Sequence, residues 1–349
     1  MSIANITANR PAPRVHRVPR FVLESGAILT DVEQAYQLDG ELGAARDNVV
    51  LVFHALTGSA DAVGDWWSGV AGPGKAIDTR RYAVLCANLL GSCYGTTGPR
   101  PGSGDAFPAI TPRDMARLTA LLVDSLGIAS IALVTGGSLG GMVALEYALA
   151  EPGRARSLVA LAAPAAHTAW AIAWNVIQRR ALELGGDDGL ALARMVGMMT
   201  YRTEQEFGAR FGRRARDDGA YEAGAYLAHH GDALVRRFDA ASYRVLTDAM
   251  DAHDIGRGRG GVDRALRAVR AAVAGPVVGV GVPGDNLYGA DEVRRWTLGA
   301  GASYRELRSI HGHDAFLLER EQVGRILADT LHDVDALAAA DSRLRELAS

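Results

Sequence analysis

The chain has 349 residues, 48% of them hydrophobic, and its 37 basic and 40 acidic residues leave a formal net charge of −3. This length can bury a substantial core, either in one large domain or in two modest ones. The charge balance lacks the concentrated basic surface that nucleic-acid binding requires, so we expect a small-molecule partner and no nucleic acid.

Apolar segments, the N-terminal residues and the cysteines indicate the cellular compartment. No segment approaches the roughly 20 consecutive apolar residues of a membrane span. Residues 1–20 lack the apolar stretch of a secretory signal, and we interpret them as a loose polar leader. Cys86 and Cys93 are too few for a disulfide framework, and Cys86 lies in an apolar run expected in the core. These features predict a cytoplasmic protein without membrane association.

Short apolar runs alternate with helix-periodic stretches along most of the chain. The runs are typical of strands buried on both faces of a parallel sheet, and they occupy residues 49–53, 82–87, 131–135, 157–163 and 276–282. Helical periodicity follows at 114–126 and 142–150. This alternation predicts an α/β fold with a mostly parallel central sheet flanked by helices.

The alternation stops between about Gly189 and His253. Several helical segments follow one another there without a convincing strand, which indicates a helical lid inserted over one end of the sheet. The glycine-rich run 256–261 resembles a hinge back to the main body. We therefore expect a core domain of residues 1–185 and 262–349 and a helical lid domain of residues 186–261.

A serine surrounded by glycines gives the strongest local signal. Residues 136–141 read GGSLGG, directly after a predicted strand and directly before a predicted helix. They match the G-x-S-x-G nucleophile elbow of the α/β-hydrolase fold, where a strained turn needs small neighbours so that the serine hydroxyl projects above the sheet. A phosphate-binding loop would need a different glycine spacing. Ser138 is the predicted nucleophile.

A serine hydroxyl needs a base to accept its proton and an acid to orient that base. In this fold the chain order is serine, acid, histidine. Asp285, just past the last buried run, and His313, in HGHDAFLLE, satisfy that order. His311 competes with His313, which we favour because an apolar helix start follows it at once. The remaining candidates are better explained as loop-shaping, surface or packing residues: His54, His229 and His230.

The tetrahedral intermediate formed by a serine nucleophile also needs backbone N–H donors for its oxyanion. One is predicted from Leu139, the residue after the nucleophile, and the second from the loop after the first buried run. That loop reads HALTG at residues 54–58, and Leu56 is the expected donor.

Several blocks of sequence together resemble the homoserine O-acyltransferase family of the α/β-hydrolase superfamily. They extend over most of the chain from about residue 20, and comprise AYQLDGEL (35–42), HALTG (54–58), residues 65–99, GGSLGGM, GLALARMVGMMTYRT, RFDAASY and GHDAFL. The resemblance implies acetyl transfer from acetyl-CoA to the side-chain hydroxyl of homoserine, in methionine biosynthesis, through an acyl-serine intermediate in a ping-pong cycle. It also implies a homodimer formed through the lid helices, acetyl-CoA as co-substrate, and neither a permanently bound cofactor nor a metal.

The same resemblance suggests the acceptor site. Arg194 would clamp the amino acid's carboxylate, Tyr201 would lie beside it, and Asp314 would pair with the ammonium group. A planar guanidinium suits a carboxylate, and a carboxylate suits an ammonium group.

Three departures from the family pattern bear on this acceptor pocket and the lid. Leu139 stands where methionine or phenylalanine is frequent, the segment ELGGDD (183–188) is short, and Gly284 stands where serine or threonine is common. Alternatives therefore remain: serine or a specialised-metabolite alcohol as acceptor, succinyl-CoA as donor, and, more distantly, a carboxylesterase-type hydrolase or a non-catalytic binding protein.

Overall fold

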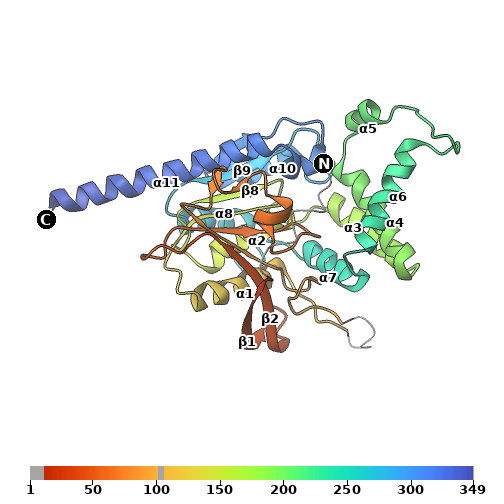
Figure 1. The fold of residues 1–349 in the computed structure, drawn as a ribbon. Helices are drawn as coiled ribbons and strands as arrows, with labels where there is room; N and C mark the ends of the chain where they lie inside the picture. The colour runs from red at the N-terminus through yellow and green to blue at the C-terminus, as the bar shows by residue number, and fades with distance from the viewer. Residues whose placement is uncertain (1–11, 101–105, 349) are drawn as a thin grey trace.

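A central eight-stranded sheet organises the molecule (Figure 1). The computed structural model describes residues 12–100 and 106–348. The strand order is β1-β2-β6-β3-β7-β8-β9-β10; β1 and β2 are antiparallel, β2 is antiparallel to β6, and all other neighbours are parallel. Their bounds are β1 Arg14–Val22, β2 Ile28–Asp39, β3 Val49–Phe53, β6 Ala83–Ala87, β7 Ile131–Gly137, β8 Leu158–Leu161, β9 Val277–Gly281 and β10 Ser303–Glu306, while β4 (Ala71–Gly72) and β5 (Ile77–Asp78) form a separate pair.

The five predicted apolar runs are five of the six inner strands, and β2 is the sixth. Every residue of β3, β6, β7, β8 and β9 is buried. Successive side chains point to opposite faces, so that Leu51 joins the core on one side of the sheet while Val50 and Val52 join the core on the other. Both faces are therefore covered, as a parallel sheet requires.

The N-terminal interpretation was wrong for the residues that the structure describes. Residues 14–20, expected in a loose leader, belong to β1, which pairs with β2 from Arg14 to Val22. Only Val18 and Phe21 of this strand are buried. An edge strand with one polar face carries a weak hydrophobic signal, which explains why sequence patterning missed it. Residues 1–11 lie outside the described part.

Helices cover the sheet and form a separate unit beside it. Their bounds are α1 Pro112–Ser125, α2 Leu139–Ala150, α3 Ala169–Leu182, α4 Gly186–Tyr201, α5 Glu204–Arg210, α6 Glu222–Val235, α7 Ala240–Asp251, α8 Val262–Ala272, α9 Ala290–Gly299, α10 Ala315–Leu318 and α11 Arg320–Ala348, with short turns η3 (Ala62–Trp66) and η4 (Gly312–Asp314). The core on one face includes apolar residues of α1, α2, α8 and α9, and the core on the other includes those of α11.

The helical unit is built from α3, α4, α6 and α7. Helix α4 packs against the other three, and α3 also packs against α7; in Figure 1, α3, α4 and α6 lie together beside the sheet. The segment that leads into this unit and the segment that leads out of it lie side by side. The His167 N–H donates to the His253 carbonyl (2.9 Å), and the Ile255 N–H donates to the Ala165 carbonyl (3.1 Å). Helix α3 thus packs with the insertion although it precedes residue 186.

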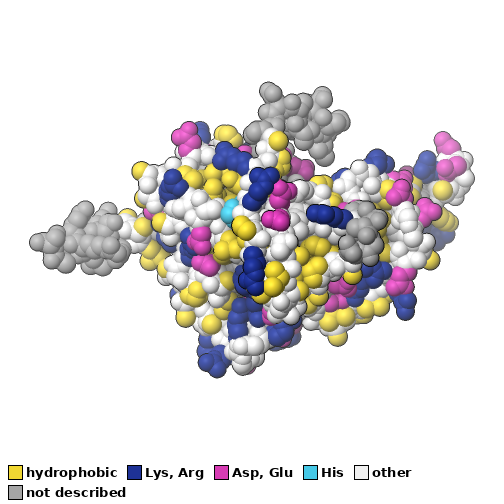
Figure 2. All heavy atoms as spheres, turned by 90° about the horizontal axis from the view of Figure 1, so that it is seen from below, with side chains coloured by type: hydrophobic (Ala, Val, Ile, Leu, Met, Phe, Trp, Pro, Cys, Tyr) yellow, Lys and Arg dark blue, Asp and Glu magenta, His cyan; other side chains and the backbone are white. Residues whose placement is uncertain are grey.

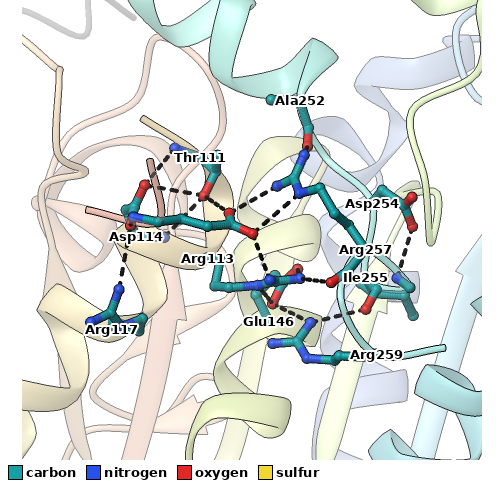
Figure 3. A network of polar contacts seen from close by, with 12 residues as sticks. Thr111, Arg113, Asp114, Arg117, Glu146, Ala252, Asp254, Ile255, Arg257 and Arg259 are labelled. Atoms are coloured by element: carbon teal, nitrogen blue, oxygen red, sulfur yellow. Dashed lines mark hydrogen bonds and ion pairs between the residues drawn. The ribbon is translucent and has the colours of Figure 1, made fainter. Parts of the chain in front are cut away.

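An ion-pair network fastens the returning segment to the core (Figure 3). Arg257 pairs with Glu24 at 2.8 Å, and Arg259 pairs with the buried Glu146 of α2 at 2.8 Å. Arg113 of α1 contacts both acids and also donates to the Arg257 carbonyl (3.0 Å). The glycine-rich segment 256–261 is therefore anchored by its two arginines.

The surface carries both signs of charge. On the face shown in Figure 2, acidic and basic side chains are interspersed with hydrophobic ones. Within residues 12–100 and 106–348, no helix combines the length and the apolar character needed to cross a membrane.

Candidate active site

Ser138 lies in the sharp turn between β7 and α2. Its φ of 56° and ψ of −125° are rare for a residue with a side chain. The turn is held because the Ser138 N–H donates to the Leu161 carbonyl at 2.9 Å, and the Ser138 carbonyl accepts from Gly141 and Met142. Ser138 is only 5% exposed, so its reactivity depends on the groups that enclose it.

Close packing explains the glycines of the turn. A Cβ on Gly140 would lie 2.1 Å from the Phe53 carbonyl oxygen, and a Cβ on Gly137 would lie 2.3 Å from the Phe316 ring. Neither distance is tolerable for a real side chain. The glycines therefore let the turn approach β3 and the segment after His313.

Asp285 and His313 are joined by a buried hydrogen bond. The Nδ1 atom of His313 lies 2.8 Å from Oδ2 of Asp285, and the side chains are 3% and 0% exposed. The other Asp285 oxygen, Oδ1, accepts from the N–H groups of Leu287 (2.7 Å) and Tyr288 (2.9 Å). The carboxylate is thus fixed by the loop after β9. With the proton on Nδ1, the Nε2 atom of His313 can accept another.

Three aromatic rings enclose the His313 imidazole. Tyr201, Tyr288 and Phe316 lie with ring centroids 5.7, 5.2 and 5.6 Å from it. Burial disfavours the protonated form, but the charge of Asp285 and its hydrogen bond outweigh burial, so the pKa of His313 is raised above its ordinary value. The site therefore stabilises the imidazolium that a base forms during catalysis.

One cavity of about 90 Å³ brings most of the predicted residues together. Ser138 and His313 line it, with the oxyanion candidate Leu56 and the three predicted acceptor residues, Arg194, Tyr201 and Asp314. The histidine and the serine therefore face one space, although they are far apart in sequence. A larger cavity of about 510 Å³ shares Ala55, Thr57, Arg194 and Leu317 with it. Its other walls include Asp65, Trp66, Tyr94 and Arg237.

The other histidines have different partners. His311 lies 3.3 Å from Glu206, not against Asp285. His54 is fully buried, and Nε2 accepts from the Leu89 N–H at 3.0 Å, which leaves the proton on Nδ1, 2.8 Å from the Ala55 carbonyl. Its burial lowers its pKa to about 4. His54 thus shapes its loop, as the sequence indicates. The two lid histidines lie on α6, His229 exposed and His230 in edge contact with Tyr226.

The two oxyanion candidates come from different loops: Leu139 follows the nucleophile directly, and Leu56 lines the same cavity as Ser138. Leu139 is the first residue of α2, where a backbone N–H has no intrahelical acceptor. Leu56 lies in a turn closed by a hydrogen bond from the Gly58 N–H to the Ala55 carbonyl (2.9 Å). Both positions are compatible with donation toward Ser138.

Arg194 and Tyr201 are the residues of α4 that line the cavity. The Arg194 guanidinium lies 5.4 Å from the centre of the Tyr201 ring. Burial raises the pKa of Tyr201, so its hydroxyl stays neutral. Arg194 lines both cavities and can therefore present its charge to a ligand.

Asp314 already has a cationic partner. Its Oδ2 lies 3.1 Å from Nη2 of Arg202, whose Nη1 is 3.2 Å from Glu206. These three side chains are 5–15% exposed. Burial raises the pKa of Asp314, and Arg202 and Arg194 oppose that shift. Glu206 also lies 3.7 Å from Arg210, so the carboxylate of this cluster that lines the cavity is that of Asp314.

Sequence reasoning gave no role to Arg202 or Arg237. Both lie in blocks that carry the family resemblance, MTYRT and RFDAASY. Their place in these blocks is the one sequence signal that could have pointed to a functional role. Their contacts with Asp314 and Thr57 join residues more than 100 positions apart, so no local pattern could assign them.

Comparisons with known proteins agree with this geometry. Residues 48–185 match the family model described as alpha/beta hydrolase fold. The structure of a homoserine O-acetyltransferase from Bacillus anthracis superposes with a TM-score of 0.81 at 23% identity, covering 91% of this chain and 96% of that one. Esterase E22 gives the same TM-score at 21% identity, covering 91% and 99%. At these identities the likeness shows the fold, and the protein is of the α/β-hydrolase class.

Sequence comparison is more specific. The homoserine O-acetyltransferase of Thermus thermophilus is 46% identical over 344 residues, covering 88% of each chain, and that of Chlorobium chlorochromatii is 41% identical over 339 residues, covering 90% of this chain and 94% of the other. A Staphylococcus aureus homoserine O-acetyltransferase structure has 30% identity and a TM-score of 0.78, covering 91% and 94%. The chain belongs to the homoserine O-acetyltransferase family, a family of acyltransferases.

Proposed function

We propose that this protein transfers an acetyl group from acetyl-CoA to the side-chain hydroxyl of L-homoserine, with Ser138, His313 and Asp285 as catalytic triad. The observation that carries the proposal is the shared cavity of Ser138 and His313, with His313 held by Asp285 at 2.8 Å. Family membership gives the class of reaction, and the residues around this cavity give its chemistry.

The reaction proceeds in two half-reactions. His313 Nε2 accepts the proton of Ser138 as the hydroxyl oxygen attacks the thioester carbonyl, and the N–H groups of Leu56 and Leu139 stabilise the resulting oxyanion. The C–S bond then breaks, His313 returns the proton to the leaving thiolate, and CoA departs from an acetyl-Ser138. In the second half, His313 takes the proton of the acceptor hydroxyl as its oxygen attacks the acetyl carbonyl; the bond from that carbon to the Ser138 oxygen then breaks, and His313 returns the proton to that oxygen.

Charge complementarity supports an amino acid as acceptor. Arg194 offers a guanidinium to the carboxylate, and Asp314, which lines the same cavity, offers a carboxylate to the ammonium group. Arg202 fixes one oxygen of Asp314 and leaves the carboxylate able to accept a second charged partner. A zwitterion held at both ends directs its side-chain hydroxyl to the acyl-enzyme.

Exclusion of water supports transfer over hydrolysis. The nucleophile and base are buried, and His313 is surrounded by aromatic rings. An oriented acceptor in a small site gains an effective concentration that can exceed that of bulk water, on the order of 10⁵ M or more. The helices above the site therefore act as a lid, in which we include α3 by its packing as well as the expected residues 186–261.

We also propose a cytoplasmic homodimer formed through the lid helices. Large hydrophobic side chains on or beside α3 and α4 are exposed, namely Trp170, Val176, Ile177, Leu184, Leu192 and Met199. Light scattering should give the mass of two chains, and Ile177→Asp should shift it toward one.

Mass spectrometry tests the covalent scheme. Protein mixed with acetyl-CoA and no acceptor should gain the mass of one acetyl group on Ser138, and Ser138→Ala should gain none. Adding homoserine should discharge the label. Kinetics that require donor and acceptor to be bound together would contradict the scheme.

Arg194→Ala separates acyl transfer from ester hydrolysis. Transfer to homoserine should fall by roughly 10- to 100-fold, the loss expected for a hydrogen bond between charged groups, while p-nitrophenyl acetate hydrolysis stays within about twofold. A panel of serine and other alcohols, with acetyl-CoA and succinyl-CoA as donors, would reveal a different acceptor or donor for the same chemistry.

A further inference from the structure

Arg237, at the junction of α6 and α7, reaches from the lid to the loop that follows β3. Its Nη1 donates to the backbone carbonyl of Thr57 and to the Tyr94 hydroxyl oxygen, both at 2.7 Å. Its Nη2 lies 3.3 Å from the Thr57 hydroxyl oxygen. One exposed guanidinium thus contacts both acceptor atoms of a single loop residue.

The residue it holds is next to Leu56, one of the two proposed oxyanion donors. Leu56 and Thr57 are the central residues of the turn from Ala55 to Gly58. On the core side, His54 bonds the Ala55 carbonyl. On the lid side, Arg237 bonds the Thr57 carbonyl. The Ala55–Leu56 peptide, which carries the Leu56 N–H, is therefore anchored by the core, and the Thr57–Gly58 peptide that ends the turn is anchored by the lid.

The surroundings of Arg237 favour a structural contact over an ion pair. The acceptors are the neutral oxygens of Thr57 and Tyr94, and Tyr94 packs edge-on against Phe238, the next residue of the lid segment, at 5.7 Å. Asp65 lines the same cavity as Arg237. Burial and the nearby Asp61 raise its pKa, and the charge of Arg237 opposes that rise only in part. Hydrogen bonds to neutral oxygens therefore direct the guanidinium at the loop.

We propose that Arg237 is a positioning residue of the oxyanion hole, through which the lid sets the orientation of the Leu56 N–H. The inference rests on the proposed use of Ser138 and Leu56 in acyl transfer, and it adds a lid residue to the catalytic geometry. An oxyanion donor contributes about 10²- to 10³-fold to rate when it is preorganised. Because Arg237 acts through the loop, its removal should cost less, about 10- to 100-fold.

The test uses p-nitrophenyl acetate, which acylates serine without CoA or an amino-acid acceptor. The rate of the p-nitrophenol burst should fall about 10- to 100-fold in Arg237→Met, with little change in the KM for acetyl-CoA. Arg237→Lys, which retains one donor for the Thr57 carbonyl, should recover part of the rate. Thr57→Val, which removes only the 3.3 Å contact, should lose less. Arg236→Met, at the exposed neighbouring position, is the matched control and should behave like the unmodified protein.

Two results would overturn the inference in different ways. A raised KM for acetyl-CoA in Arg237→Met with an unchanged burst rate would mean that Arg237 binds the donor and does not position the loop. Absence of a Ser138-dependent burst in the unmodified protein would refute the acyl-enzyme scheme itself. Thermal unfolding midpoints of all variants show whether a lost burst reflects lost folding.

Discussion

Arg202, at the end of α4, forms an ion pair with Asp314, the residue after His313, at 3.1 Å. The same segment contacts both catalytic loops, because the Arg202 carbonyl accepts from the Asn286 side chain at 2.8 Å and the Thr203 hydroxyl donates to the Ile310 carbonyl. The link between α4 and α5 therefore connects the lid to the loops that carry Asp285 and His313.

Replacing Arg202 should weaken acceptor binding. In Arg202→Met, Asp314 loses a cation that lowers its pKa, so its proton is held more tightly and its charge is less available to an ammonium group. The KM for the acceptor should rise by roughly 10- to 100-fold, the value of a charge-assisted hydrogen bond, while the p-nitrophenyl acetate burst changes little. Arg202→Lys should restore part of the affinity. A change in donor KM alone would contradict this role.

The pH dependence of acylation should follow His313. Only the neutral imidazole accepts the Ser138 proton, and the pKa of His313 is raised above the ordinary histidine value of 6.5. The rate should therefore begin to fall at a pH above 6.5 as the solution is made more acidic. In Asp285→Asn the larger cause of the rise is gone, burial still lowers the pKa of His313, and only the charge of Asp314 still raises it, so the acidic limb should move to lower pH. The maximum rate should fall by ~10⁴-fold because the tautomer is no longer fixed. Rates of the burst phase from pH 5 to 9 measure both effects, and an unshifted limb in Asp285→Asn would refute the assignment.

Gly140 and Gly137 should differ in the effect of an added methyl group. A Cβ at Gly140 meets the backbone oxygen of Phe53, which cannot move aside, so Gly140→Ala should prevent stable folding. A Cβ at Gly137 meets the side chain of Phe316 and not a backbone atom, so the clash can be relieved by a shift of that side chain. Gly137→Ala should therefore fold but lose activity, because Phe316 packs against His313.

Gly208 in α5 supplies the control for these glycines, since nothing lies within 4 Å of the position that an added methyl group would take there. Gly208→Ala should stabilise the helix by up to about 1 kcal/mol. Circular dichroism melting curves compare all three variants, and equal losses at Gly140 and Gly208 would show that crowding is not the cause.

The ion pairs of Figure 3 should contribute more to stability than an exposed pair. Glu146 is 2% exposed and contacts Arg113 and Arg259. Glu146→Gln removes the anion that Arg259 pairs with and leaves Arg113 with Glu24 alone, so it should lower the free energy of unfolding by roughly 3 kcal/mol. The control is Glu33→Gln, whose partner Arg17 is 73% exposed, and which should cost less than about 1 kcal/mol. Urea unfolding measures both, and equal costs would contradict this ranking.

Local sequence was sufficient for the features that depend on neighbouring residues. The apolar runs of β3, β6, β7, β8 and β9 predicted the inner strands because burial on both faces requires continuous apolar sequence. The turn at Ser138 was predictable because its glycines, strand and helix are contiguous. The half-polar edge strand β1 was not, since only two of its residues are buried.

What the sequence alone determined is the five apolar strands, the order in which they follow one another, and the residue types at the nucleophile turn, because these are properties of short contiguous segments. Only the tertiary structure decided that His313 and not His311 meets Asp285, that α3 packs with the lid, and that Arg202 and Arg237 hold Asp314 and Thr57. Each of these contacts joins separate elements of the fold, often from distant parts of the chain. Their partners are chosen by how those elements pack in space, which no local periodicity records.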